Sequence, residues 1–87
     1  MNFNQIQKDI IYYILEYYKN PEKKLIPCIE VFEKIFHEKH TNLEIEENTR
    51  ELVSRGILSP YSFHSYLDFT ETFKSSLDYK LFRDKKI

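Results

Sequence analysis

The single glycine of the chain, Gly56, most constrains what the sequence can fold into. Before it, residues 42–55 follow a pattern in which apolar side chains return every three or four positions, as they do in a helix. After it come two short segments typical of β-strands, 57–61 and 66–70, with a polar turn between them. Glycine adopts the left-handed backbone conformation that ends many helices. The stretch from Glu46 to Thr70 therefore predicts a helix, a glycine stop and a short hairpin.

Length and composition predict one globular domain that spans residues 1–87. Hydrophobic residues make up 41% of the chain and aromatic residues 16%, which is enough for a core. The net charge of -1 gives no general attraction to nucleic acid or to a membrane surface. The sequence has neither an apolar run long enough to span a bilayer nor a signal-peptide pattern, so we expect a cytoplasmic protein.

The first predicted helix covers residues 3–19 and ends at Asn20-Pro21. Its apolar side chains cover an arc of about 200°, whereas a helix on a protein surface needs only a little over ~100°. Either the helix is enclosed by its own chain, or one apolar strip meets a second subunit. We favour a homodimer whose interface is formed by the second strip: Ile11, Leu15 and Tyr18.

A second helix is predicted over residues 27–39, with a very short edge strand at Leu25-Ile26 before it. Its apolar stripe consists of Cys28, Val31, Phe32, Ile35 and Phe36. The third helix begins with a capping box, in which Thr41 and Glu44 satisfy backbone groups of each other, and it runs to about Arg55. Its predicted inward residues are Ile45, Thr49, Leu52 and Val53.

Two strands and one helix are predicted after Gly56. The first strand holds Ile57, Leu58 and Tyr61, and Ser59-Pro60 places it at an edge or ends it early. The second strand runs from Tyr66 to Thr70. A last helix opens at Thr70-Glu71 and places Phe73, Leu77 and Leu81 at four-residue steps. The predicted fold class is therefore mainly α with a small β-hairpin.

These elements resemble the winged helix-turn-helix superfamily of small bacterial, archaeal and phage-type regulators. Leu52-Val53 with Gly56-Ile57-Leu58 is similar to the phrase that ends the third helix in that family. Phe69-Thr70-Glu71 is similar to the phrase that opens its terminal helix. The resemblance covers almost the whole chain and implies a winged helix, with a three-helix core, a two-stranded wing and a C-terminal helix.

The resemblance implies a small dimeric transcriptional regulator that places its third helix in the major groove of double-stranded DNA. Asn48 and Arg50 are suited to base edges, while cations and helix-terminal groups can hold phosphates. The predicted phosphate contacts are Lys34, Lys39, His40, Thr41, Asn42, Lys80 and Arg83. The basic tail has a second interpretation, in which its cations complement the C-terminal end of a helix.

Two features favour a different function. The third helix carries four Glu against two Arg, and the predicted wing tip, 62–65, has no Lys or Arg. Carboxylates on this face repel the phosphates that supply most non-specific affinity for DNA. The glutamates either solvate an exposed helix, or they belong to a protein-interaction module, for example an inhibitor of a nucleic-acid-binding protein. The contacts of such a module would be Glu44, Glu47, Glu51, Phe63 and His64.

Catalysis and metal binding are not expected from this sequence. A glycine-rich phosphate loop needs more than one glycine, and no nucleophile–base pattern is present. His37 and His40 can share a helix face, but the single cysteine lies nine residues before His37, so we expect surface histidines and no metal. We predict no cofactor, no enzymatic activity, and a buried Cys28 in place of a reactive thiol.

Overall fold

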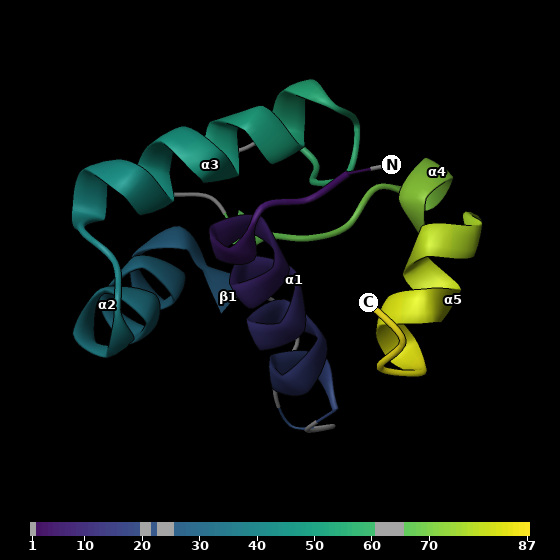
Figure 1. Cartoon of the computed structure of the whole chain (residues 1–87), viewed down its shortest axis with the longest axis horizontal. Helices are drawn as coiled ribbons and strands as arrows, with labels where there is room; N and C mark the ends of the chain where they lie inside the picture. Colours follow the sequence, from purple (N-terminus) through teal and green to yellow (C-terminus); the bar gives the residue numbers. More distant parts are fainter. Residues whose placement is uncertain (1, 20–21, 23–25, 61–65) are drawn as a thin grey trace.

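The computed structural model describes residues 2–19, 22, 26–60 and 66–87, and this part of the chain is mostly helical (Figure 1). Three helices come first along the chain and two shorter helices follow near its end. Their bounds are α1 (Gln5–Tyr18), α2 (Cys28–Glu38), α3 (Asn42–Ser54), α4 (Glu71–Lys74) and α5 (Leu77–Arg83). The first three lie close to the ranges that the apolar spacing predicts.

Side-chain caps fix where α1 and α3 begin. The side chain of Asn4 accepts a hydrogen bond from the Gln7 backbone N–H at 2.8 Å, and Gln7 Oε1 accepts one from the Asn4 backbone N–H at 3.1 Å. Thr41 and Glu44 form the same reciprocal box before α3, as predicted. Such boxes satisfy N–H groups that the first turn of a helix leaves without partners. The stop after α3 is also confirmed, because Gly56 has a φ of 75°.

The helices enclose α1 on several sides. It packs against α2, α3 and α5, and in Figure 1 it lies between α2 and α5 while α3 crosses above it. This arrangement accounts for the wide apolar arc of α1, since one strip faces α2 and α3 and another faces the C-terminal helices. The buried apolar side chains form one cluster: Ile10, Ile11, Ile14, Ile26, Cys28, Val31, Ile35, Ile45, Leu52, Ile57, Leu58, Leu67, Phe69, Phe73 and Phe82.

The predicted two-stranded wing is not seen, which corrects the winged-helix fold class. The two-residue segment β2 (Tyr66–Leu67) pairs antiparallel with β1 (Ile26–Pro27), and not with the segment that follows α3. Between the two segments predicted as wing strands, the described residues show only an isolated bridge from Leu58 to Phe69. The Ser59 N–H donates to the Asp68 carbonyl at 2.9 Å and the Thr70 N–H to the Ile57 carbonyl at 3.0 Å, one on either side of this bridge, so the pairing seen among the described residues is limited to this point.

The predicted last helix is two helices, because Ser76 begins a new one. Ser76 Oγ accepts a hydrogen bond from the Tyr79 backbone N–H at 3.2 Å and donates one to the Phe73 carbonyl at 2.6 Å. This cap restarts the helix with a different side facing the core. Phe73 is buried as predicted, but Leu77 is 71% exposed, and Phe82, which was not predicted to be in the core, is fully buried.

Candidate functional site

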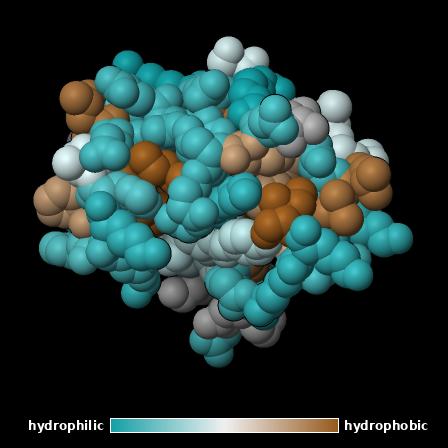
Figure 2. Space-filling view, viewed as in Figure 1, coloured by the Kyte–Doolittle hydropathy of each residue, from teal (hydrophilic) through white to brown (hydrophobic). Residues whose placement is uncertain are grey.

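Most of the predicted site residues of the third helix lie along one exposed side of α3, which we call its outer face. Its exposed side chains are Leu43, Glu44, Glu47, Arg50, Glu51 and Ser54. The opposite side buries Ile45, Thr49 and Leu52 in the core. In the view of Figure 2, the upper edge of the molecule, where α3 runs in Figure 1, is mostly hydrophilic with small hydrophobic areas. α3 therefore presents to solvent a mostly polar ridge that Leu43 interrupts near its start.

The outer face of α3 carries an excess of negative charge. Arg50 Nη2 lies 2.6 Å from Glu46 Oε1 one turn away, so the charge of this arginine is largely compensated. Glu44, Glu47 and Glu51 form no salt bridge with a cation of the described residues. Three carboxylates on a solvated helix repel polyanions and attract cationic surfaces.

Asn48, which was predicted to contact bases, is turned toward α1. Its Oδ1 accepts hydrogen bonds from Asn4 Nδ2 at 2.8 Å and from Gln7 Nε2 at 3.3 Å. Its Nδ2 donates to the Glu44 carbonyl at 2.8 Å. Both ends of this amide are therefore used within the chain, and reading an adenine edge would require breaking these bonds.

Most of the predicted phosphate contacts around the α2–α3 turn also have partners within the chain. His40 Nε2 lies 3.0 Å from Asp9 Oδ2, and both side chains are largely buried. Thr41 is engaged in its capping box, and Lys34 Nζ lies 3.6 Å from Glu38 Oε1. Two further residues predicted to hold phosphate here, Lys39 and Asn42, are exposed. A phosphate at this turn would meet few uncommitted donors.

The structure does not bring the basic tail to this turn. Lys80 and Arg83 lie on α5, which in Figure 1 is on the opposite side of the molecule from the connection between α2 and α3. Lys80 is exposed, and the guanidinium carbon of Arg83 lies 5.7 Å from the centre of the Tyr79 ring. The two groups predicted to hold phosphates are thus separate surfaces.

The residues predicted to form a dimer interface are used inside the chain. Ile11 is fully buried and Leu15 is partly buried. The Tyr18 hydroxyl donates to the Leu67 carbonyl at 2.7 Å and accepts from the Ile26 backbone N–H at 3.3 Å, which ties α1 to the paired segments β1 and β2. This strip therefore offers little surface to a second subunit, and a homodimer, which stays a prediction, would need another face.

A polar network between α1 and α3 escaped the sequence analysis. Gln7 is 2% exposed, and its Nε2 donates to Glu51 Oε2 at 2.5 Å. Its Oε1 accepts from Arg55 Nη1 at 3.2 Å. The spacing of Asn4 and Gln7 is that of a capping box, so the sequence did contain a signal for the start of α1. No local pattern indicates that Gln7 also reaches α3.

Exposed apolar side chains on α2 were also missed. Phe36 was expected in the core, but it is 47% exposed, and Ile29 is 52% exposed. The two residues are seven positions apart and so lie on the same side of α2. The buried side of this helix is narrower than predicted and consists of Cys28, Val31 and Ile35. Together with Leu43, which is 64% exposed at the start of α3, they give the region of α2 and α3 an exposed apolar component.

Cys28 and the possible metal ligands offer neither a reactive thiol nor a metal site among the described residues. Burial raises the pKa of the Cys28 thiol to about 11, against a weaker opposing effect of its backbone hydrogen bond, so the thiol is protonated at neutral pH. Among the described residues, no three His, Cys, Asp or Glu side chains lie close enough to hold a metal ion. Phe63 and His64 lie outside the described residues, so their predicted partner contacts stay predictions.

Comparisons with known proteins give no match, whether with protein-family models, with curated proteins or with solved structures. Within the described part of the chain, no helix combines the length and the apolar character needed to cross a bilayer. The function is therefore inferred from the geometry of the described residues.

Proposed function

We propose that the chain is a protein-interaction module that binds its partner through the outer face of α3. The observation that supports this most is that the groups of α3 suited to DNA are bonded within the chain, whereas its carboxylates are exposed and carry no neutralising cation. The amide of Asn48 and the guanidinium of Arg50, which are suited to bases, are engaged by groups of the same chain. The side chains of Glu44, Glu47 and Glu51 are exposed, and although Glu44 accepts from Thr41 and Glu51 from Gln7, no cation of the described residues neutralises any of the three.

The charge of this face argues for a protein partner over DNA. Association with DNA draws most of its non-specific free energy from cations that replace condensed counterions at phosphates. The outer face of α3 offers three uncompensated carboxylates and one arginine that is already paired with Glu46. A basic protein surface reverses this balance, since each carboxylate then gains an attractive partner.

The apolar side chains define the second requirement for the partner. Leu43 opens the outer face of α3, and Ile29 and Phe36 are exposed on α2, the helix that packs against α3. Protein interfaces combine an apolar centre with a polar rim, and exposed apolar groups near charged ones mark such surfaces. The partner is therefore expected to be a protein that places basic side chains around an apolar contact.

Paired variants test this surface. Leu43→Ser with Glu47→Lys alters two exposed residues one turn apart on α3, and neither residue caps the helix. Leu77→Ser with Glu71→Lys makes the same chemical change on α4 and α5, where Leu77 is 71% exposed and the Glu71 side chain is 92% exposed. Wild-type chain and both variants are immobilised and incubated with extract of the cells that produce the chain. The proposal predicts a protein that the wild type and the α4–α5 variant retain and the α3 variant loses.

A titration with duplex DNA of mixed sequence completes the test. At low ionic strength the wild type is expected to give no change in the anisotropy of a labelled duplex. Binding that weakens steeply with salt and is reduced by Arg50→Ala would contradict the proposal, because it would show that α3 acts on DNA. Equal retention of every protein by the two paired variants would also contradict it.

A further inference from the structure

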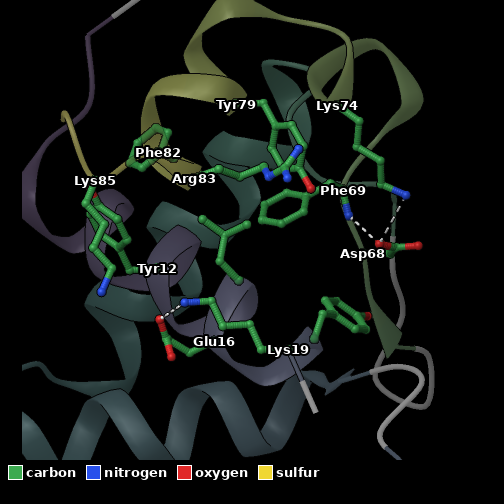
Figure 3. A pocket seen from close by; sticks show the side chains of 12 residues that line it. Tyr12, Glu16, Lys19, Asp68, Phe69, Lys74, Tyr79, Phe82, Arg83 and Lys85 are labelled. Atoms are coloured by element: carbon green, nitrogen blue, oxygen red, sulfur yellow. Dashed lines mark hydrogen bonds and ion pairs between the residues drawn. The ribbon is translucent and has the colours of Figure 1, made fainter. Parts of the chain in front are cut away.

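A cavity of about 600 Å³ lies on the side of the molecule formed by α1 and α5. Its walls are the second half of α1, the segment Asp68-Phe69, Lys74 of α4, and the chain from Tyr79 to Lys85. Cavities that bind small molecules in proteins commonly have volumes in this range. Figure 3 shows the hollow between Phe69 and Arg83 on one side and Glu16 and Lys19 on the other. The outer face of α3 contributes no residue to it.

The floor of the cavity is apolar and largely aromatic. The rings of Phe69 and Tyr79 lie with their centres 5.7 Å apart, and those of Tyr12 and Phe82 with their centres 5.2 Å apart. Leu15 adds an aliphatic surface from α1. Phe69 and Phe82 are buried, so the floor is held in place by the core. Because Phe69 is only 4% exposed and Phe82 has no exposed surface, the rings that a ligand can touch are those of the partly buried Tyr12 and Tyr79, which suit a planar ring.

The rim of the cavity is basic. Four cationic side chains line it, and two of them are paired with the two carboxylates that also line it. Lys19 Nζ lies 2.9 Å from Glu16 Oε1, and Lys74 Nζ lies 3.9 Å from Asp68 Oδ1. These pairs leave Arg83 and Lys85 as the cations that an incoming anion would meet.

Arg83 and Lys85 form no salt bridge with a carboxylate of the described residues. The guanidinium of Arg83 lies over the Tyr79 ring and points into the hollow in Figure 3. Lys85 lines the same cavity, and the pKa of Glu16 is lowered chiefly by its hydrogen bond to Lys19 and to a smaller extent by the charge of Lys85. Arg83 lies beside Tyr79 and Lys85 lies on the side of Tyr12 and Glu16, so the two cations give the rim an excess of positive charge that attracts an anion.

The backbone at Lys85 is unusual and sets the position of this side chain. Lys85 has a φ of 57°, the left-handed conformation in which glycine is the usual residue after a helix. Its N–H donates to the Phe82 carbonyl at 3.0 Å, and the N–H of Lys86 donates to the Leu81 carbonyl at 2.8 Å. The chain thus accepts an unfavourable conformation for a lysine at the place where a cation lines the cavity.

We propose that this cavity binds a mononucleotide, with the phosphate held at the basic rim by Arg83 and Lys85 and the base against the rings of Tyr12 and Tyr79. A phosphate monoester carries close to two negative charges at neutral pH. The fork of an arginine guanidinium matches the geometry of phosphate oxygens, and a lysine adds a second charge. A planar base fills the apolar part of the cavity, which an isolated phosphate ion would leave empty. This site is independent of the partner surface proposed on α3.

Three probes separate the contributions of the ring and the phosphate: AMP, adenosine, and ribose 5-phosphate. Each is titrated into the full chain and followed by two-dimensional NMR of the backbone amides, which also reports whether a variant is folded. AMP is expected to bind with a Kd below about 1 mM, and each of the other two at least about tenfold more weakly. GMP, CMP and UMP are titrated in the same way, and a tighter response to one of them would identify the preferred base.

Neighbouring lysines provide a matched pair of variants. Lys85→Gln removes a cation that lines the cavity, whereas Lys86→Gln removes the next cation along the chain, which does not line it. Arg83→Gln and Lys85→Gln are each expected to weaken AMP binding about tenfold, and Lys86→Gln less than about twofold. The proposal is overturned if none of the four nucleotides binds at about 5 mM. Equal binding of AMP and adenosine, or equal weakening by Lys85→Gln and Lys86→Gln in folded chains, also overturns it.

Discussion

Gln7 is a buried polar residue whose side chain joins two helices. Its Oε1 accepts from Arg55 and from the Asn4 backbone, and its Nε2 donates to Asn48 and Glu51. Among the described residues, no buried side-chain nitrogen or oxygen lacks a partner. A satisfied polar group inside a small core ties α1 to α3 and reaches Glu51 at the edge of the acidic outer face.

Replacing Gln7 by alanine should lower the free energy of unfolding by about 1–3 kcal/mol, because four hydrogen-bonding groups lose their partner. Gln5→Ala is the control, since the exposed Gln5 side chain bonds to Asp9 at 2.9 Å and to no other described residue. Its effect should stay within about 0.5 kcal/mol. Urea unfolding followed by circular dichroism measures both values. Equal effects of the two substitutions would show that the network does not hold the helices together.

Replacing Lys85 by glycine should change the stability of the chain and its binding of AMP in opposite directions. Because its φ is 57°, Lys85→Gly should raise the free energy of unfolding by about 1 kcal/mol, whereas the same change at Lys86 should not raise it. The Lys85→Gly chain should also bind AMP more weakly than the wild type. Urea unfolding and the nucleotide titration test the two effects, and a Lys85→Gly chain that is less stable than the wild type would contradict the first.

Cys28 predicts how stability changes at alkaline pH. Its pKa is raised from 9.0 to about 11 in the folded chain, chiefly by burial. Below pH 9 the thiol is protonated in both states, so it has no effect; as the pH rises toward 11 the unfolded state loses the proton first, and stability falls. At pH 10 the loss should be about 1 kcal/mol. Unfolding of the wild type and of Cys28→Ala at pH 8 and pH 10 measures it, and identical pH dependence would argue against a buried thiol.

At the scale of elements, local signals predicted α3 well and the C-terminal helices poorly. The capping box from Thr41 to Glu44 and the stop at Gly56 lie within a few residues of the helix that they define, so the sequence carries them directly. The break between α4 and α5 depends on Ser76, which reads in sequence as one more residue of a helix whose apolar steps continue. The four-residue spacing of Phe73 and Leu77 therefore predicted the wrong buried side for the end of the chain, where Phe82 is buried and Leu77 is exposed.

Ser76 should therefore matter more than its neighbour. Ser76→Ala removes the cap that accepts from the Tyr79 N–H, and it should lower the free energy of unfolding by about 1 kcal/mol. Ser75→Ala removes only a hydroxyl that donates to the Glu71 carbonyl at 3.1 Å, and its effect should be about 0.5 kcal/mol or less. Chemical denaturation of both variants compares them. A larger loss for Ser75→Ala would mean that α5 does not begin at Ser76.

At the scale of the whole molecule, pairing between distant segments was the part that sequence could not supply. Tyr66–Leu67 was expected to pair with the segment just after α3, its nearest candidate along the chain, but it pairs with Ile26–Pro27. The choice depends on how α1 and α2 place β1 beside β2, and no local pattern records this. The site shows the same division. The outward carboxylates of α3 could be predicted from the sequence, but the bonds of Asn48 to α1 and of His40 to Asp9 depend on contacts between helices that only the structure shows.

These internal partners shape the functional proposal. The uncompensated carboxylates of α3 and the exposed apolar side chains of α2 and α3 suit a basic protein, while the cavity beside α5 suits a small anion. The two surfaces share no residue, so either can fail its test without affecting the other.

The most direct test of the α3 surface is photo-crosslinking from position 47. A photoreactive side chain replaces Glu47 in one chain and Glu71 in a control chain, and each is irradiated in the cells that produce it. Glu47 lies on the outer face of α3, whereas Glu71 opens α4. We predict an adduct from position 47 that is digested by protease, resists nuclease, and is absent from position 71. A nuclease-sensitive adduct from position 47 would contradict the account, because it would place DNA or RNA on the face proposed to bind protein.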